Sequence, residues 1–387
     1  MKDYTLIATT AFGLEGITAR ELSTLGYTDL QVENGRVIFH GGYADIAKTN
    51  LWLRTADRIL IRMAKFPAVT FEELFQGTKA VCWEDLLPED AEFPVTGRSV
   101  RSGLFSVPDC QAIVKKAVVE RMKTRYPRQH FEETGAKYKI EVSLLKDIAT
   151  LTVDTSGAGL NKRGYRSLAG LAPIKETLAA AMISLSFWKD GRLLVDPFCG
   201  SGTIPIEAAM MALNRAPGLK RRFLCETWPD FPPEIFARMR EEAEDVFRRD
   251  MKLNIFGSDL DPKAVELAQL HAKEAGLSDY IHFKQMAVSD FYSKESFGFV
   301  ITNPPYGERL GEVRQVERLY RDLGRIYSRL DNWSWYLITA NPDFEKLFGR
   351  KADKRRKLYN GRLECQYYQF LSKEKPPRDF YTGKNPL

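Results

Sequence analysis

The residues best suited to chemistry form the stretch Asn303-Pro304-Pro305-Tyr306. Residues 297–302 before it are apolar, β-branched or aromatic, which predicts a buried strand that stops at the two prolines, because proline cannot donate to a sheet ladder. The Asn303 side-chain oxygen and a backbone carbonyl near Pro304 can each accept one N–H of a planar exocyclic amine, which leaves the nitrogen lone pair free to attack. The Tyr306 ring can stack on the heterocycle, a contact worth about 1–3 kcal/mol per base. On these four residues alone, a strand-ending turn with a hydrogen-bonded Asn stays the alternative.

A second stretch, Asp196 to Thr203, follows the apolar run 193–195 and precedes an apolar helix. Its glycines, Gly200 and Gly202, let the backbone bend sharply and approach a ligand closely. The acid at the strand end can bind a cationic amine. A nucleotide-phosphate loop is the alternative, but the third glycine of Gly-x-Gly-x-x-Gly is missing and no Gly-Lys-Ser/Thr follows.

The same pattern of strand, loop and polar residue recurs further along the chain. Asp259 follows the strand expected at 255–258, with Asp261 as second choice because it can simply cap the next helix. Asp290 follows the strand expected at 281–285. Because ligands of open α/β sheets bind at the carboxyl ends of the strands, we expect positions 196, 259, 290 and 303 to share one site.

The elements that must position these residues alternate between strands and helices. Helices are expected at 174–188, 262–275 and 320–330, a strand at 335–339 and a closing hairpin at 358–371. The charged insertion 214–253 is expected to be solvated packing without chemistry. The basic run 350–357 fits a phosphate contact or a solvated loop equally well. Residues 307–310, after the tyrosine, are expected to be mobile and able to close over a base.

The first part of the chain has the pattern of an α+β region. Strands and helices alternate within the first 50 residues or so, and a hairpin is expected at 139–155. A helix that Ser106 or Asp109 can cap carries an apolar stripe over 110–122 and cations on its other face. That basic face is interpreted as solvated surface.

The bulk composition excludes several classes of protein. A chain of 387 residues is long enough for two or three domains, and 44% hydrophobic with 12% aromatic residues excludes global disorder. The net charge of +6 is only weak support for a polyanionic partner. Five scattered cysteines without a Cys-x-x-Cys pair and four histidines predict no disulfide framework and no metal site. The lack of a signal-peptide core or a long apolar stretch predicts a soluble cytoplasmic protein.

These motifs resemble known families. Asn303-Pro304-Pro305-Tyr306 is similar to the Asn/Asp-Pro-Pro-Tyr/Phe motif of amino-methyltransferases, and residues 196–203 resemble motif I of S-adenosylmethionine methyltransferases. Residues 44–155, with their Ser-x-Pro-Asp helix and final hairpin, look like a THUMP RNA-binding domain with a ferredoxin-like leader. The whole chain thus resembles the THUMP-containing RNA guanine-N2 methyltransferases, in their bacterial 23S ribosomal RNA branch.

The resemblance implies a Rossmann-like α/β methyltransferase domain at 161–387, preceded by an α+β region with a ferredoxin-like subdomain at 1–55 and a THUMP domain at 56–160. It implies S-adenosylmethionine as cofactor and RNA, 23S ribosomal RNA in particular, as partner, without a metal or a membrane. It also implies a base flipped out of its stack onto Tyr306. The implied catalytic residues are Asn303, Pro304, Pro305 and Tyr306; the implied cofactor-binding residues are Asp196, Phe198, Cys199, Gly200, Ser201, Gly202, Thr203, Asp259, Leu260, Asp290 and Asn303.

Three other functions stay open on the sequence. An adenine-N6 nucleic-acid methyltransferase shares the Asn-Pro-Pro-Tyr motif. A protein-glutamine methyltransferase shares it too, but without a basic THUMP-like domain. A non-catalytic RNA-binding protein would have no reason to keep polar residues in all four loops.

Overall fold

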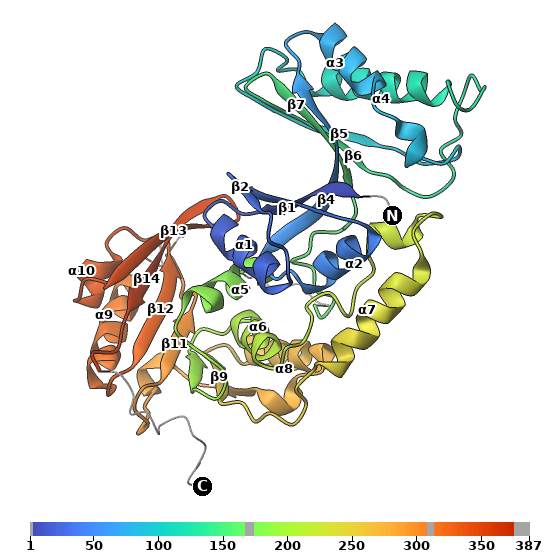
Figure 1. Ribbon diagram of the computed structural model, residues 1–387. Coiled ribbons are helices and arrows are strands. Elements are labelled where there is room, and N and C mark those ends of the chain that lie inside the picture. Colours follow the sequence, from blue (N-terminus) through green and yellow to red (C-terminus); the bar gives the residue numbers. More distant parts are fainter. Residues whose placement is uncertain (1–2, 167–173, 308–312, 375–387) are drawn as a thin grey trace. The chain divides into compact units, whose positions relative to one another are not determined.

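The computed structural model describes residues 3–166, 174–307 and 313–374 (Figure 1). The chain forms two compact units, and each unit includes one short segment that lies, in sequence, between segments of the other. Unit 1 consists of residues 1–10, 18–160 and 221–241, and unit 2 of residues 11–17, 161–220 and 242–387. None of the described helices is long and apolar enough to span a bilayer.

Unit 1 is built on one sheet of seven strands in the order β2-β3-β1-β4-β7-β6-β5. The strand β4 holds it together, because its first half pairs with β1 and its second half with β7. The pair β6 and β7 is the hairpin expected at 139–155. The strands are β1 Tyr4–Thr10, β2 Gln31–Glu33, β3 Arg36–Gly41, β4 Ala56–Pro67, β5 Val95–Val100, β6 Ile140–Leu145 and β7 Ile148–Asp154.

Four helices cover this sheet: α1 Glu15–Thr24, α2 Tyr43–Trp52, α3 Phe71–Lys79 and α4 Val107–Met122, with a short 3-10 turn, η1 Trp83–Asp85. The stripe of α4 is buried as expected, and Ser106 stands at its N-cap without a side-chain cap bond. The cations of α4 are not simply solvated. Lys115 forms an ion pair with Glu133, and Arg121 forms one with Glu84.

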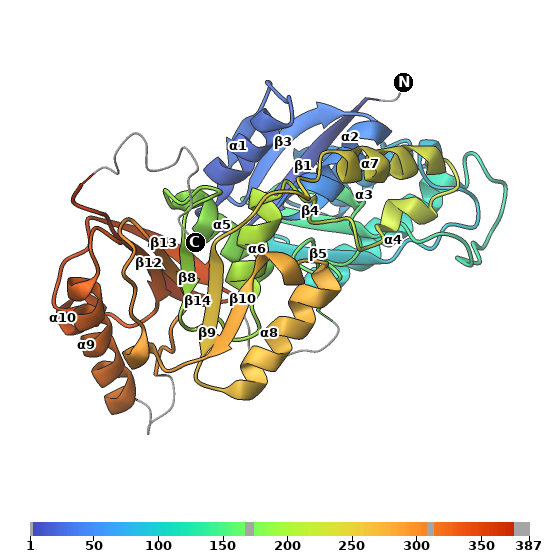
Figure 2. The same ribbon diagram turned by 90° about the horizontal axis from the view of Figure 1, so that it is seen from below.

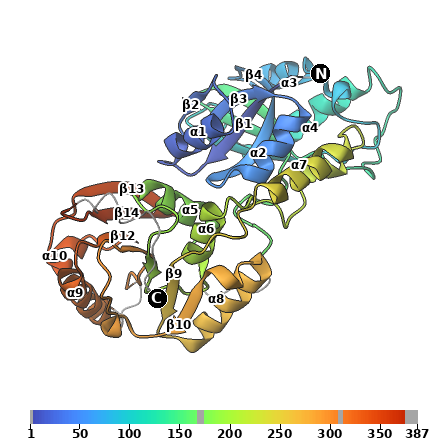
Figure 3. The same ribbon diagram turned by 60° about the horizontal axis from the view of Figure 1, so that its bottom comes forward.

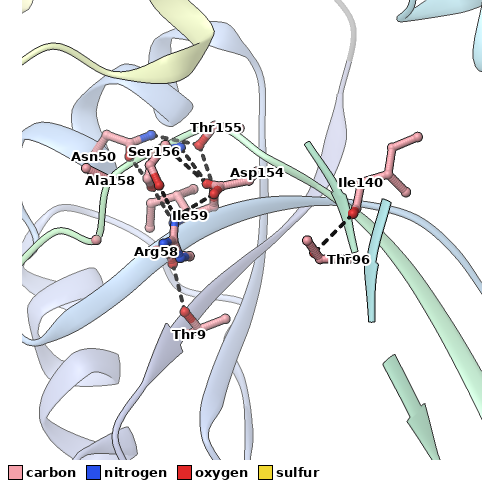
Figure 4. Close-up of polar contacts among 12 residues, drawn as sticks. Thr9, Asn50, Arg58, Ile59, Thr96, Ile140, Asp154, Thr155, Ser156 and Ala158 are labelled. Atoms are coloured by element: carbon pink, nitrogen blue, oxygen red, sulfur yellow. Dashed lines mark hydrogen bonds and ion pairs between the residues drawn. The ribbon is translucent and has the colours of Figure 1, made fainter. Parts of the chain in front are cut away.

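A buried polar cluster fixes the chain where it leaves β7 (Figure 4). The Ser156 hydroxyl accepts from the Ile59 N–H at 2.8 Å and donates to the Asn50 side chain at 2.5 Å. The Asn50 amide donates to the Thr155 hydroxyl at 2.9 Å, and that hydroxyl donates to the Ile59 carbonyl at 2.7 Å. Each polar group of the cluster therefore has a partner inside the fold.

Removing one member of this cluster should destabilise unit 1. Ser156→Ala leaves the buried Ile59 N–H and the Asn50 oxygen without their partner, which should lower the free energy of unfolding by about 1–3 kcal/mol. Ser23→Ala is the matched control, because that hydroxyl is exposed and bonds only within α1; it should change stability by less than about 0.5 kcal/mol. Calorimetry of the full chain checks this, and equal shifts in both variants would contradict the role given to the cluster.

The insertion 214–253 is more than solvated packing, which corrects the sequence-based expectation. It contains η2 Leu224–Thr227 and α7 Pro233–Asp245, and residues 221–241 belong to unit 1. Trp228 stacks on Tyr138, with ring centroids 4.6 Å apart, and its indole N–H donates to the Lys137 carbonyl. Phe231 lies 4.8 Å from the ring of Tyr43, which begins α2, and Figure 2 shows α7 running past that helix. The proline- and aromatic-rich part of the insertion is thus a buried anchor.

Unit 2 is built on a second sheet of seven strands in the order β10-β9-β8-β11-β12-β14-β13. The strands β8 to β12 are parallel, and β14 runs antiparallel to β12 and β13. The strands are β8 Leu194–Asp196, β9 Ile255–Asp259, β10 His282–Gln285, β11 Phe299–Thr302, β12 Ser334–Thr339, β13 Lys354–Asn360 and β14 Leu363–Phe370. The helices are α5 Glu176–Leu185, α6 Thr203–Ala212, α8 Pro262–Ala275, α9 Val313–Arg329 and α10 Phe344–Phe348, with 3-10 turns η3 Ser278–Tyr280 and η4 Val288–Asp290.

Both faces of this sheet are covered at its centre, which explains why the strands β8, β11 and β12 are buried throughout. Along β11, Phe299 and Ile301 face the core formed with α5, α6 and α8, whereas Val300 faces the core formed with α9 and α10. Figures 1 and 3 show α9 and α10 on one side of the sheet and α5 and α6 on the other. The strand β8 lies between β9 and β11, where the order of the strands reverses, so the loops that follow these strands open at the point where such sheets bind ligands.

Candidate active site

The loop after β8 approaches its neighbours closely at one glycine and leaves space at another. Gly202 has φ +81°, and a Cβ there would lie 3.0 Å from the Cβ of Ala268 in α8. Only glycine fits this start of α6. Gly200 also has positive φ, but a Cβ there would have no described atom within 4 Å. The loop is therefore packed against α8 at one end and open at the other.

Asp196 ends β8 with one carboxylate oxygen engaged and one free. Its Oδ1 accepts from the Thr302 hydroxyl at 2.6 Å and from the Phe198 N–H at 3.2 Å. Its Oδ2 is buried and has no hydrogen-bond partner among the described residues. Burial, with a further contribution from Asp259, raises the pKa of Asp196 to about 7. A buried, unpaired carboxylate oxygen is a site for a cationic ligand group.

A cavity of about 400 Å³ opens beside this carboxylate. It brings together the predicted residues of the β8 loop and Asn303, which follows β11. One wall of the cavity comes from the start of α8. The sequence predicted none of these residues for the site except Asp261, the alternative to Asp259. The lining residues are Ile174, Asp196, Phe198, Cys199, Gly200, Ser201, Thr203, Ile204, Asp261, Lys263, Ala264, Leu267 and Asn303.

Asp259, the last residue of β9, and Asp290, after β10, lie outside this lining. Both oxygens of Asp259 accept backbone N–H groups, from Gly200 at 2.9 Å and from Asp261 at 3.0 Å. A carboxylate has further lone pairs, so Asp259 can still accept ligand hydroxyls. Asp261 caps α8, since its side chain accepts from the Lys263 N–H at 2.9 Å. Leu260 is 70% exposed, and Asp290 is exposed in η4, where it accepts from the neighbouring Ser289 hydroxyl.

The Asn303 side chain is already engaged by the tyrosine of its own motif. The Tyr306 hydroxyl donates to Asn303 Oδ1 at 2.5 Å, and Asn360 of β13 donates to the same hydroxyl at 3.4 Å. The Tyr306 ring is partly buried against the core on the α5 and α6 side, and this burial raises its pKa. In this state one lone pair of the oxygen expected to accept an amine is engaged. Stacking on a base, which stays a prediction for Tyr306, requires the ring to leave this contact.

A layer of buried ion pairs beneath the β8 loop is absent from the sequence-based site. Arg163 and Glu207 of α6 are both buried and make two hydrogen bonds of 3.2 Å. Arg166 pairs with Glu176 at 3.0 Å and donates to the hydroxyl of Thr203, the first residue of α6 after the β8 loop. The sequence contained a signal for such an ion pair, because Glu207 lies in the otherwise apolar helix α6 and a buried glutamate needs a cationic partner.

His271 of α8 is one more support for this loop. It is buried, and its ring nitrogen lies 3.0 Å from the Ser201 carbonyl. His271 is therefore a packing residue of α8. The contact between its ring and the Ser201 carbonyl also fixes the loop that lines the cavity.

Comparison with known proteins gives the family. The model of the RMKL-like methyltransferase domain matches residues 163–369, that of the RlmL ferredoxin-like domain residues 5–60, and that of the THUMP domain residues 68–154. The chain is 52% identical over 380 residues to "Putative RNA methyltransferase YpsC" of Bacillus subtilis (strain 168), covering 98% of both chains. The chain belongs to the RMKL-like methyltransferase family.

Solved structures of relatives agree with this assignment. A Listeria monocytogenes protein described as "a predicted N6-adenine-specific DNA methylase" is 52% identical, with a TM-score of 0.92, covering 96% of this chain and 97% of its own. SMU.472, described as "a putative methyltransferase complexed with SAH", is 47% identical, with a TM-score of 0.92, covering 97% of this chain and 100% of its own.

The family confirms the predicted fold class, a Rossmann-like methyltransferase domain after a ferredoxin-like and THUMP region. It also confirms S-adenosylmethionine as the cofactor of this methyltransferase. The cavity fits that cofactor, because its unpaired Asp196 oxygen can take an ammonium group and Gly200 leaves room for a ligand. The roles of individual residues, including Phe198, Cys199 and Ser201 in the lining, stay predictions, as does the division at residues 55 and 160. Residues 308–310 of the expected mobile segment lie outside the described residues.

Among the described residues there is no cluster of three His, Cys, Asp or Glu side chains that could hold a metal ion. All five cysteines, each within the described ranges, are free thiols.

Proposed function

We propose that this RMKL-like methyltransferase transfers a methyl group from S-adenosylmethionine to an exocyclic amine of a base in RNA, namely guanine N2 of 23S ribosomal RNA. One observation carries the proposal: the Asn303 side chain lines the same cavity as the free carboxylate oxygen of Asp196 and the glycine loop after β8. A residue suited to hold an amine and residues suited to hold the cofactor are thus adjacent.

The residues on the cofactor side bind and orient. Asp196 Oδ2 takes the ammonium group of the methionine part, which satisfies the oxygen that has no partner among the described residues. Asp259 accepts the ribose hydroxyls, beside its bonds to Gly200 and Asp261. Leu260 and Asp290 are exposed near the ends of β9 and β10 and contact the adenine. The cofactor supplies an activated methyl group, so orientation of the amine is the main task left to the chain.

The residues on the base side hold two N–H groups of the amine. Asn303 Oδ1 accepts one after Tyr306 has released it. The Pro304 carbonyl accepts the other, while the Pro305 carbonyl accepts from Tyr320. The lone pair then points along the line of attack, and Tyr306 stacks on the flipped base. No strong base is required, since the proton can leave after the methyl transfer.

The choice of RNA rests on the THUMP domain at 68–154. Such a module fits recognition by shape and phosphate contacts rather than by base reading. An adenine-N6 methyltransferase is the second candidate, favoured by the description of the Listeria relative and by the shared Asn-Pro-Pro-Tyr motif. The free thiols fit a reducing cytoplasm as the place of action.

Mass spectrometry of nucleosides separates the candidates. RNA and DNA are digested from cells that lack the enzyme and from the same cells after the gene is restored. We expect N2-methylguanosine from 23S ribosomal RNA to disappear and return with the gene. Return of N6-methyladenine instead, in RNA or in DNA, would favour the second candidate, and an unchanged nucleoside profile would overturn both.

Loss of the Asp259 carboxylate should weaken cofactor binding without stopping catalysis. Asp259→Ala removes the acceptor of the ribose hydroxyls and the partner of the Gly200 N–H, so the cofactor Kd should rise by about tenfold or more. Titration calorimetry measures Kd, and turnover at saturating cofactor should approach the wild-type value. A normal Kd combined with lost turnover would contradict this role.

A further inference from the structure

Tyr320 is a buried residue of α9 whose hydroxyl reaches the Asn-Pro-Pro-Tyr turn. Its ring is fully buried in the core on the α9 side, edge-on to Phe344 with centroids 5.0 Å apart. Its hydroxyl lies 2.7 Å from the Pro305 carbonyl and 2.9 Å from the Thr339 hydroxyl at the end of β12. No sequence motif pointed to either side chain.

The direction of each hydrogen bond between Pro305, Tyr320 and Thr339 follows from the groups involved. A carbonyl can only accept, so the single hydrogen of Tyr320 goes to Pro305. The Thr339 hydroxyl must therefore donate to the Tyr320 oxygen, and Thr339 in turn accepts from the Asn341 N–H at 3.1 Å. Burial raises the pKa of Tyr320 to about 12, so it stays a donor at neutral pH. The end of β12 is thus linked to the turn by one directed chain.

The geometry of the two prolines connects the Pro305 carbonyl, which Tyr320 holds, with the Pro304 carbonyl, which accepts from the amine. The Pro304 carbonyl lies in the rigid peptide plane that joins the two prolines. The ring of Pro305 fixes φ, so ψ of Pro305 is the one free torsion between the two carbonyls. Holding the Pro305 carbonyl therefore limits the direction of the Pro304 carbonyl to rotation about this one torsion.

We propose that Tyr320 and Thr339 are positioning residues for methyl transfer, which hold the Pro305 carbonyl so that the Pro304 carbonyl and Asn303 present a fixed pair of acceptors to the amine. This inference rests on the proposed function. A displacement of about 1 Å at a reacting group can cost roughly 100-fold in rate.

Tyr320→Phe tests the proposal, because it removes the hydroxyl and keeps the buried ring. The probe is ribosomal RNA from cells that lack the enzyme, with tritium-labelled S-adenosylmethionine in single-turnover assays. We expect the rate of methyl transfer to fall by about 10- to 100-fold, with the cofactor Kd within about twofold of wild type. Tyr327→Phe is the matched control, since it removes a hydroxyl from the same helix that bonds to Arg350. An equal loss of rate in both variants would overturn the proposal.

A second pair of variants separates positioning from stability. Thr339→Val removes the donor to Tyr320 and should reproduce the effect of Tyr320→Phe, whereas Thr339→Ser keeps the hydroxyl and should restore most of the rate. The double variant Tyr320→Phe with Thr339→Val should be no slower than the slower single variant, because both changes break one chain. Independent, multiplying losses would contradict the proposal.

Hydrogen exchange gives a readout that needs no substrate. The amides of Tyr306 and Gly307 should exchange faster in Tyr320→Phe than in wild type or Tyr327→Phe. Unchanged exchange would show that Tyr320 does not anchor the turn, whatever the reaction. If the wild-type enzyme leaves the RNA unmethylated, the proposed function fails, and the exchange data still decide whether the anchor exists.

Discussion

Asn303→Ala should abolish methyl transfer while the cofactor still binds. The substitution removes the side-chain oxygen that accepts one N–H of the target amine, so the amine loses its orientation toward the methyl group. We expect the single-turnover rate to fall by about 1,000-fold or more. The cofactor Kd should change by less than about threefold, because Asp196 and Asp259 remain in place. Rapid-quench assays with labelled cofactor measure the rate, and titration calorimetry measures Kd.

Asn303→Asp is the matched control for this substitution. It keeps an oxygen at the same position and should retain a measurable part of the activity, whereas alanine should not. Tyr306 donates to the same oxygen in the structure, so alanine removes this acceptor and aspartate keeps one. Residual activity in Asn303→Ala combined with loss of cofactor binding would contradict the assigned role.

Asp196→Asn should produce the largest loss of cofactor affinity. The substitution keeps the shape of the side chain and its contact with Thr302 but removes the charge that faces the ammonium group. Truncating one partner of a buried charge pair costs about 2–5 kcal/mol, so we expect Kd to rise by about 100-fold near pH 7.5. Asp261→Asn is the control, because Asp261 lines the same cavity but caps α8, a task that asparagine performs equally well.

The pH dependence of cofactor binding should show the titration of Asp196. The pKa of Asp196 is raised to about 7 in the free protein, so below that pH the carboxyl is protonated and neutral. Binding of an ammonium group requires the proton to leave, and the affinity should therefore fall by close to tenfold per pH unit below about pH 7. Above about pH 8 the α-amine of the ligand loses its own proton. In Asp196→Asn the acid limb should be flat, and an unchanged acid limb would contradict the role of Asp196.

Much of the fold of unit 2 could be predicted because its strands are short apolar runs that end at conspicuous residues. Asp196, Asp259 and Asn303 each stand at or just after the end of a strand, and parallel strands bring such ends to one edge of the sheet. The insertion 214–253 was misjudged because its charge pattern hid Trp228 and Phe231, whose partners Tyr138 and Tyr43 are far away in sequence.

The supporting contacts of the site could not be predicted for the same reason. The partners of Pro305 and Thr203 are Tyr320 and Arg166, and neither follows a local pattern. Arg163 belongs to a connector whose sequence is typical of solvated basic surface, yet it is buried with Glu207. Periodicity identifies which face of an element is buried, but it does not identify which hydrogen bond crosses between elements.

A crystal structure of this protein with S-adenosylhomocysteine tests the central claim most directly. We predict that the ligand ammonium lies within hydrogen-bond distance of Asp196 Oδ2 and that the sulfur faces Asn303 across the cavity between the β8 loop and α8. A ligand bound outside this cavity, or an Asn303 side chain turned away from the sulfur, would contradict the account.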